Sequence, residues 1–68
     1  MRTATIPQMR ARLKSAGVDI EYRSDKIVTR KAGFVALSFA QTFHNEQAER
    51  SILMRAANRY GIDMPAQS

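Results

Sequence analysis

The chain has 68 residues, a net charge of +5 and no cysteine. A domain of this size buries only about 60% of the surface of its unfolded chain, so its core supplies little spare stability. The absence of cysteine excludes disulfide bonds, and with a single histidine it also excludes a classical zinc site. We therefore expect one small domain, stabilised by close helix packing or by association into a homodimer.

The sequence contains no segment typical of a membrane or secreted protein. The N-terminal residues lack the apolar core of a signal peptide, and no apolar run approaches the ~20 residues that a membrane span requires. A chain without cysteine is also compatible with a reducing compartment. We expect a cytoplasmic protein with no membrane partner.

The basic residues are unevenly distributed along the chain. Residues 1–33 contain eight lysines and arginines against three acids, whereas residues 34–68 contain three of each. The whole excess of positive charge therefore lies in the first half. Such a field attracts polyanions, such as nucleic acid or an acidic protein surface.

The first predicted element is a helix over residues 5–16. Thr5 and Gln8 have the spacing of a capping box, Pro7 falls in the first turn, and Gly17 is suited to the position after the last turn. One narrow stripe is apolar. It consists of Ile6, Met9, Leu13 and Ala16.

A β-hairpin is predicted over residues 18–30. Apolar residues alternate with charged ones from Val18 to Arg23, which is typical of a half-buried strand. Ser24 and Asp25 provide the turn, and the second strand follows.

Residues 34–43, FVALSFAQTF, fit two structures. Phe39 and Phe43 share a face with Val35 both in a strand and in a helix. Alanine, leucine and glutamine in this stretch favour a helix. A two-stranded hairpin, however, is only marginally stable alone and needs a third strand. We favour a third strand, with a helix as the alternative.

The last predicted element is a helix over residues 45–60, followed by a tail over 62–68. Asn45 is suited to the N-cap. Acids occupy the first turn and arginines the last turns, as the helix dipole favours, and Gly61 is suited to the end. We interpret this helix as a strut that closes the core. Its predicted buried positions are Ala48, Ile52, Leu53, Ala56 and Tyr60.

These elements predict an α+β domain in the order helix, hairpin, third antiparallel strand, helix. The alternative is α-β-β-α with residues 34–43 helical. The first order resembles that of double-stranded-RNA-binding domains, whose second helix opens with lysines that contact phosphates. Here Glu46 and Glu49 occupy that place, and their carboxylates would repel a nucleic-acid backbone.

No constellation of residues predicts catalysis or a cofactor. The chain has no cysteine that His44 could activate, and no acid or serine has the spacing from His44 that would mark a catalytic partner. Asp19 and Glu21 share the solvent face of a strand, and we interpret them as an ordinary pair of solvated acids. We expect a non-catalytic protein without a metal or cofactor.

The favoured function is nucleic-acid binding through the basic first half. The expected phosphate contacts are Arg10, Arg12 and Lys14 on the first helix, with Arg30 and Lys31 at the end of the second strand. Such contacts give affinity that depends on salt and little on base sequence.

The alternative function is a small protein-binding modulator. In this hypothesis the chain is an inhibitor or adaptor, of the kind found among phage and mobile-element accessory proteins, that docks on a larger protein machine. Met54 lies on the otherwise polar side of the second helix, and methionine adapts to irregular partner surfaces. Arg50 and Arg55 flank it as further candidate contacts.

Overall fold

The structure is a computed structural model, and it describes residues 4–41 and 45–64. Within these residues the order of elements is α1 (Ile6–Ser15), β1 (Val18–Tyr22), β2 (Lys26–Lys31), β3 (Leu37–Ala40) and α2 (Glu46–Tyr60). The α+β class, with three antiparallel strands between two helices, is confirmed. Neither of the described helices is long and apolar enough to cross a membrane.

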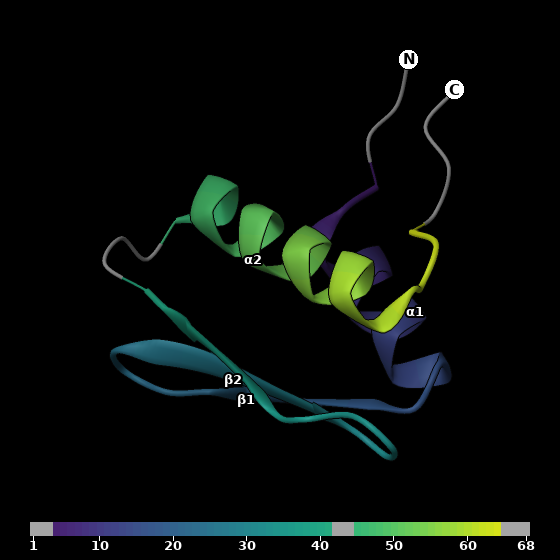
Figure 1. The fold of residues 1–68 in the computed structure, drawn as a ribbon. Helices are drawn as coiled ribbons and strands as arrows, with labels where there is room; N and C mark the ends of the chain where they lie inside the picture. Colours follow the sequence, from purple (N-terminus) through teal and green to yellow (C-terminus); the bar gives the residue numbers. More distant parts are fainter. Residues whose placement is uncertain (1–3, 42–44, 65–68) are drawn as a thin grey trace.

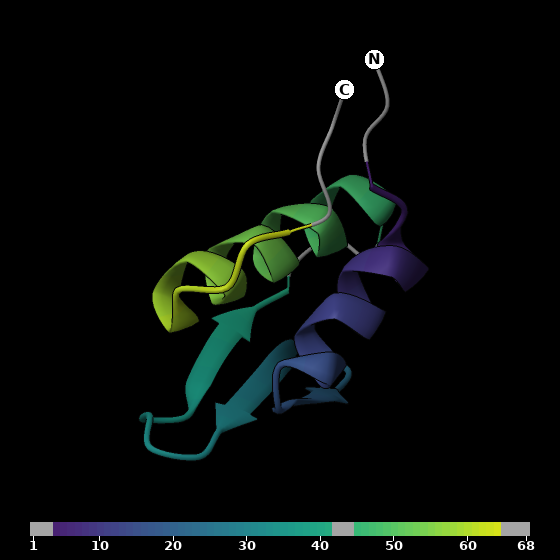
Figure 2. The same cartoon turned by 90° about the vertical axis from the view of Figure 1, so that its right-hand side faces the viewer.

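The strands form one sheet in the order β1-β2-β3. The central strand is therefore β2, and β1 and β3 each have a free edge. Both helices lie on the same side of the sheet (Figure 1). The view turned by 90° shows α1 and α2 side by side above the strands (Figure 2).

Both predicted N-caps are present. The Thr5 hydroxyl accepts from the Gln8 N–H at 3.2 Å, and the Gln8 side chain accepts from the Thr5 N–H at 2.8 Å, which completes a capping box. The Asn45 side chain accepts from the Ala48 N–H at 2.8 Å and caps α2. The far end of α2 stops at Gly61, whose φ of 69° is left-handed, as predicted.

The hairpin register separates the sheet into two faces. Ile20 of β1 lies opposite Thr29 of β2, and Tyr22 lies opposite Ile27. Because directly opposed residues point to the same side, these side chains share the face that the helices cover. Asp19 and its opposite residue Arg30 alternate with them and lie on the outer face.

The third strand is confirmed, but it is shorter than the predicted 34–43, and the helical alternative is wrong. The Phe34 N–H donates to the Lys31 carbonyl at 3.0 Å, so the turn after β2 still includes Phe34. Regular pairing begins only at Leu37. Val35, which is predicted to share a face of the strand with Phe39, precedes the strand and is 84% exposed. Residues 42 and 43 of the predicted strand lie outside the described residues.

The core lies between the two helices and the covered face of the sheet. Its largest fully buried members are Met9, Leu13, Val18, Ile27, Thr29 and Leu53. Thr29 is the one buried polar residue among those described, and its hydroxyl lies 2.9 Å from the Tyr60 hydroxyl. Most of the predicted buried positions of the two helices are buried. Ala16 and Ala48 are only half-buried, and Ala57, which was not predicted, is buried as well.

Candidate nucleic-acid interface

The structure separates the three predicted cations of α1. Arg10 and Lys14 line a hollow of about 430 Å³ beside β1. Arg12 is two residues from each of them, which places it roughly 160° away around a helix of about 100° per residue. It therefore projects from the opposite flank, and it is half-buried.

The hairpin register brings the end of β2 to the same region as α1. Lys31 lies opposite Val18, and Arg30 lies opposite Asp19. These two β1 residues directly follow the turn that ends α1. A second hollow of about 430 Å³ forms here, with Arg30 and Lys31 in its lining, and Asp19 lines both hollows. The side chains of Arg30 and Lys31 point to opposite faces of the sheet, and both border this hollow at the end of β2. We call Arg10, Lys14, Arg30 and Lys31 the α1–β2 basic surface.

Two arginines of this surface have acidic partners. The Arg10 Nε lies 3.9 Å from a carboxylate oxygen of Glu49, and Arg30 lies 3.3 Å from a carboxylate oxygen of Glu21. Hydrogen bonds from Arg23 first, and then from Arg30, hold the pKa of Glu21 below its ordinary value. Among the described residues, Lys14 and Lys31 make no ion pair with any acid.

Two cations of the surface lie over aromatic rings. The Arg10 guanidinium is 5.8 Å from the centre of the Tyr22 ring, and the Lys31 ammonium is 5.3 Å from that of Phe34. The Phe34 ring in turn meets the Tyr60 ring edge-on at 5.3 Å. This stack connects Lys31 to the core. The sequence did not indicate the stack, because it depends on how the turn after β2 folds back towards α2.

The acids at the start of α2 are bound within the molecule. The Tyr22 hydroxyl donates a hydrogen bond to Glu49, and Glu46 accepts from Arg50 at 3.0 Å. Burial first, and then the hydrogen bond to Glu49, raises the pKa of Tyr22. The start of α2 is therefore acidic and internally paired, which agrees with the interpretation of this helix as a strut.

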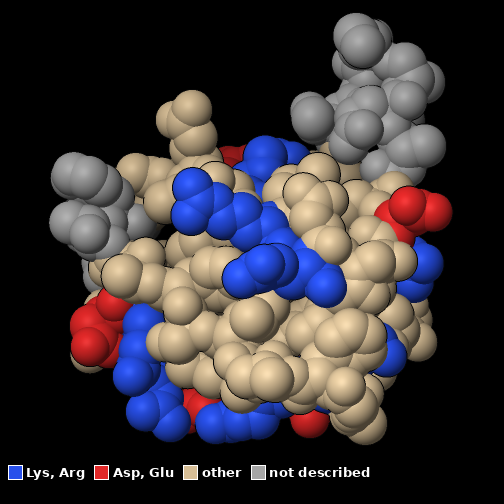
Figure 3. Space-filling view, in the orientation of Figure 1, with Lys and Arg blue, Asp and Glu red and all other residues tan. Residues whose placement is uncertain are grey.

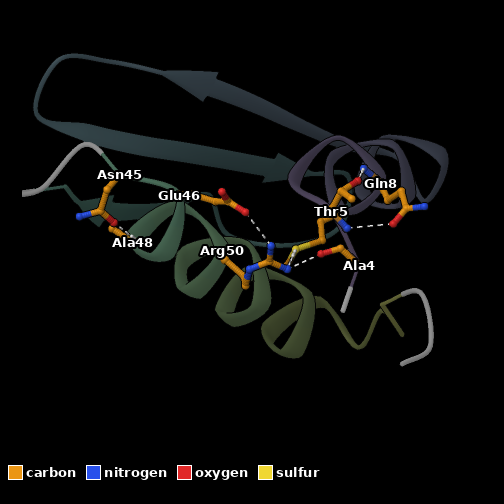
Figure 4. A network of polar contacts seen from close by, with 8 residues as sticks. Ala4, Thr5, Gln8, Asn45, Glu46, Ala48 and Arg50 are labelled. Atoms are coloured by element: carbon orange, nitrogen blue, oxygen red, sulfur yellow. Dashed lines mark hydrogen bonds and ion pairs between the residues drawn. The ribbon is translucent and has the colours of Figure 1, made fainter. Parts of the chain in front are cut away.

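Arg50 connects α2 to the segment before α1 (Figure 4). Its guanidinium donates to the Ala4 carbonyl oxygen and lies 3.8 Å from the Met9 sulfur, in addition to its pairing with Glu46. These contacts give Arg50 a structural part in holding the two helices together. Its neighbours in the predicted protein-binding group, Met54 and Arg55, lie instead on the exposed side of α2.

Figure 3 shows the face of the molecule formed by α2 and β3. Lys and Arg atoms cross its upper part, over α2, and others lie along its lower edge beside Asp and Glu atoms. Arg55 and Arg59 are exposed on α2 and make no ion pair among the described residues. They offer positive charge away from the α1–β2 basic surface, and neither of the two hollows beside α1 and β2 includes them.

Within residues 4–41 and 45–64, no group of three or more histidine, cysteine or acidic side chains is placed to hold a metal ion. Asp19 and Glu21 share the outer face of β1, as expected, and Glu21 is engaged by arginines. His44 lies outside the described residues.

Comparisons of the chain with protein-family models, with curated proteins and with solved structures found no match.

Proposed function

We propose that this protein is a non-catalytic, cytoplasmic module that binds the phosphate backbone of nucleic acid through the α1–β2 basic surface. The observation that carries the proposal is the β1–β2 register, which places Arg30 and Lys31 beside the turn that follows α1. Four cations from two elements thereby line adjoining hollows, in whose lining Asp19 is the one acid.

The existing ion pairs would not prevent phosphate binding. The Arg30–Glu21 pair lies at the surface, where such pairs contribute at most about 1 kcal/mol. The Arg10–Glu49 pair joins an exposed arginine to a half-buried carboxylate at the long distance of 3.9 Å. A phosphate oxygen is a charged acceptor that arginine binds at least as well as a carboxylate. Lys14 and Lys31 have no competing acid among the described residues.

The aromatic residues favour backbone binding over base stacking. Tyr22 and Phe34 are half-exposed, but Arg10 and Lys31 cover their rings. Binding of single strands by stacking needs open ring faces. We therefore expect affinity that depends little on base sequence and strongly on salt.

The test is fluorescence anisotropy with labelled single- and double-stranded DNA and RNA over a range of salt concentrations. Each phosphate contact contributes a slope of about −0.9 to a plot of log affinity against log salt. Four contacts predict a slope between about −3 and −4, or roughly a 100-fold loss of affinity from about 50 to 200 mM salt. No detectable binding at about 50 mM salt would refute the proposal.

Two double variants distinguish binding at this surface from a general effect of the protein's net charge. Lys14→Glu/Lys31→Glu reverses the two cations of the surface that have no ion-pair partner, and Arg55→Glu/Arg59→Glu makes the same change in net charge on α2. We expect the first to abolish binding or to reduce the slope by about two, while the second keeps the slope of the wild type. Equal losses in both variants would show that net charge alone attracts the nucleic acid.

A protein-binding modulator remains the second candidate function, because Met54 is 37% exposed on the outer side of α2, next to Arg55. An inhibitor or adaptor of this kind would dock this side of α2 on an acidic surface of a larger protein. In that case the wild type should retain a stoichiometric protein partner after nuclease treatment, and Met54→Asp should lose that partner. Retention of that partner by the variant would remove Met54 from the interface.

A further inference from the structure

The free edge of β3 carries no charge. Residues 32–43 contain no lysine, arginine, aspartate or glutamate. A band without Lys, Arg, Asp or Glu atoms crosses the face shown in Figure 3, between the charged atoms over α2 and those along the lower edge. Val35 is 84% exposed and Phe34 50%. Natural edge strands usually carry charges or prolines that prevent pairing with another chain, and this edge has neither.

The register identifies which backbone groups are free at this edge. The Gln41 N–H donates to the Asp25 carbonyl oxygen at 2.9 Å, and the β2–β3 register continues to place these two residues opposite each other, so they occupy a hydrogen-bonded position of the ladder. Hydrogen-bonded pairs alternate along an antiparallel ladder. Phe39 and Leu37 therefore bond to β2, and the N–H and C=O groups of Ser38 and Ala40 point away from the sheet.

We infer that β3 pairs with β3 of a second copy of this chain, forming a dimer with a continuous six-stranded sheet. A two-fold axis at Ser38 is the symmetric register in which the free backbone groups meet over the full length of the strand. In this register Leu37 lies opposite Phe39 of the partner, and Ala36 lies opposite Ala40 of the partner. Both sets of pairs are apolar, and aliphatic–aromatic cross-strand pairs are stabilising.

A second copy fits this edge better than a charged partner does. The strand has no side chain that would pair with a charged ligand, and its own sequence supplies an equally uncharged partner strand. Leu37 and Phe39 are only half-buried against the core, so the dimer would complete their burial. Additional burial is valuable for a domain of this size, whose own core is small.

The free edge of β1 is a weaker candidate for self-association. Arg10 and Lys14 lie beside it, so two copies paired there would bring like charges together. Arg10 and Lys14 lie beside β1, the edge strand opposite to β3. Arg30 and Lys31 lie on the central strand, and their hollow extends to Ala36, which pairs with Ala40 of the partner in the dimer. The inference rests on the uncharged edge and its free backbone groups, so it does not depend on the proposed function.

The test uses charges placed on the two-fold axis. Ser38 is exposed on the outer face of the sheet, so the monomer tolerates Ser38→Lys and Ser38→Asp. Each variant places two like charges directly opposite one another in the dimer. We expect sedimentation equilibrium to show a dimeric wild type at about 100 µM, with the dimer Kd of each variant raised at least 10-fold. An equimolar mixture of the two variants should form the heterodimer.

The control is Ser51→Lys, which adds the same charge to the exposed side of α2 and should leave the dimer unchanged. Higher salt should strengthen the dimer, because it screens the repulsion between two basic chains, whereas it weakens binding to nucleic acid. A monomeric wild type at about 100 µM would overturn the inference. So would a Ser38→Lys variant that dimerises as well as the wild type.

A cross-link gives a second readout that does not depend on charge. The chain has no cysteine, so Ser38→Cys introduces a single thiol. Residues opposite each other in a hydrogen-bonded pair have Cα atoms about 5.5 Å apart, within the range that a disulfide spans. Oxidation should link Ser38→Cys into a dimer far faster than Ser51→Cys, and equal rates would contradict the register.

Discussion

The hydroxyl groups of Thr29 on β2 and Tyr60 on α2 lie 2.9 Å apart in the core, where Thr29 is fully buried. This bond joins the central strand to the last turn of α2. The Tyr60 ring also contacts Phe34 of the turn after β2. The end of α2 is thereby held against the part of the sheet that carries Lys31.

A double-mutant cycle tests this bond. Tyr60→Phe or Thr29→Val alone leaves one buried hydroxyl without a partner, and we expect each to lower the free energy of unfolding by about 1–3 kcal/mol. The double variant removes both hydroxyls with little change in shape, so its loss should be smaller than the sum of the single losses. Denaturant unfolding of the four proteins measures the coupling. Additive losses would mean that the two hydroxyls do not interact.

The contacts of Arg50 predict a stability difference between two arginines on α2. Arg50→Ala removes the hydrogen bond to the Ala4 carbonyl and the ion pair with Glu46, and we expect a loss of about 1–2 kcal/mol in the free energy of unfolding. Arg55→Ala is the matched control, because Arg55 is exposed and makes no ion pair among the described residues. It should change stability by less than about 0.5 kcal/mol. Similar losses in both variants would refute the structural part assigned to Arg50.

Much of the fold could be predicted from the sequence, because its signals are local. Thr5 and Gln8 mark the capping box, Asn45 marks the start of α2, and Gly61 marks its end, and each has the predicted place in the structure. The hairpin followed from alternation between Val18 and Tyr22. These features depend on residues only a few positions apart, where spacing alone determines the geometry.

The start of β3 and the neighbours of the site residues could not be predicted in the same way. Val35 fits a strand by composition, but the turn after β2 continues to Phe34, whose ring packs on Tyr60 far along the chain. The separation of Arg12 from the hollow beside β1 depends on which flank of α1 faces that strand. Long-range packing decides both, and no local pattern reports it.

Tyr22 predicts a pH dependence of stability in the alkaline range. Burial and the hydrogen bond to Glu49 raise the pKa of this phenol above its ordinary value of 10.0. A raised pKa means that the folded state holds the proton to higher pH than the unfolded chain does. The resulting stabilisation is complete below about pH 10 and is lost as the pH rises above it.

Comparison with Tyr22→Phe isolates this effect, since lysines titrate in both proteins. The variant cannot ionise at position 22, so the difference in unfolding free energy between the two proteins should shrink as the pH rises above about 10. Chemical unfolding at a series of pH values measures this difference. A constant difference from about pH 8 to 11 would mean that Tyr22 titrates alike in the folded and unfolded states.

The most direct test of the central claim is a map of the surface that nucleic acid touches. A short duplex is titrated into ¹⁵N-labelled protein at about 50 mM salt, and the amide chemical shifts are followed. The account predicts that the largest changes fall in residues 10–19 and 30–34, which surround the two hollows, and that they disappear as salt is added. Changes confined to the exposed side of α2, or no changes at low salt, would contradict it.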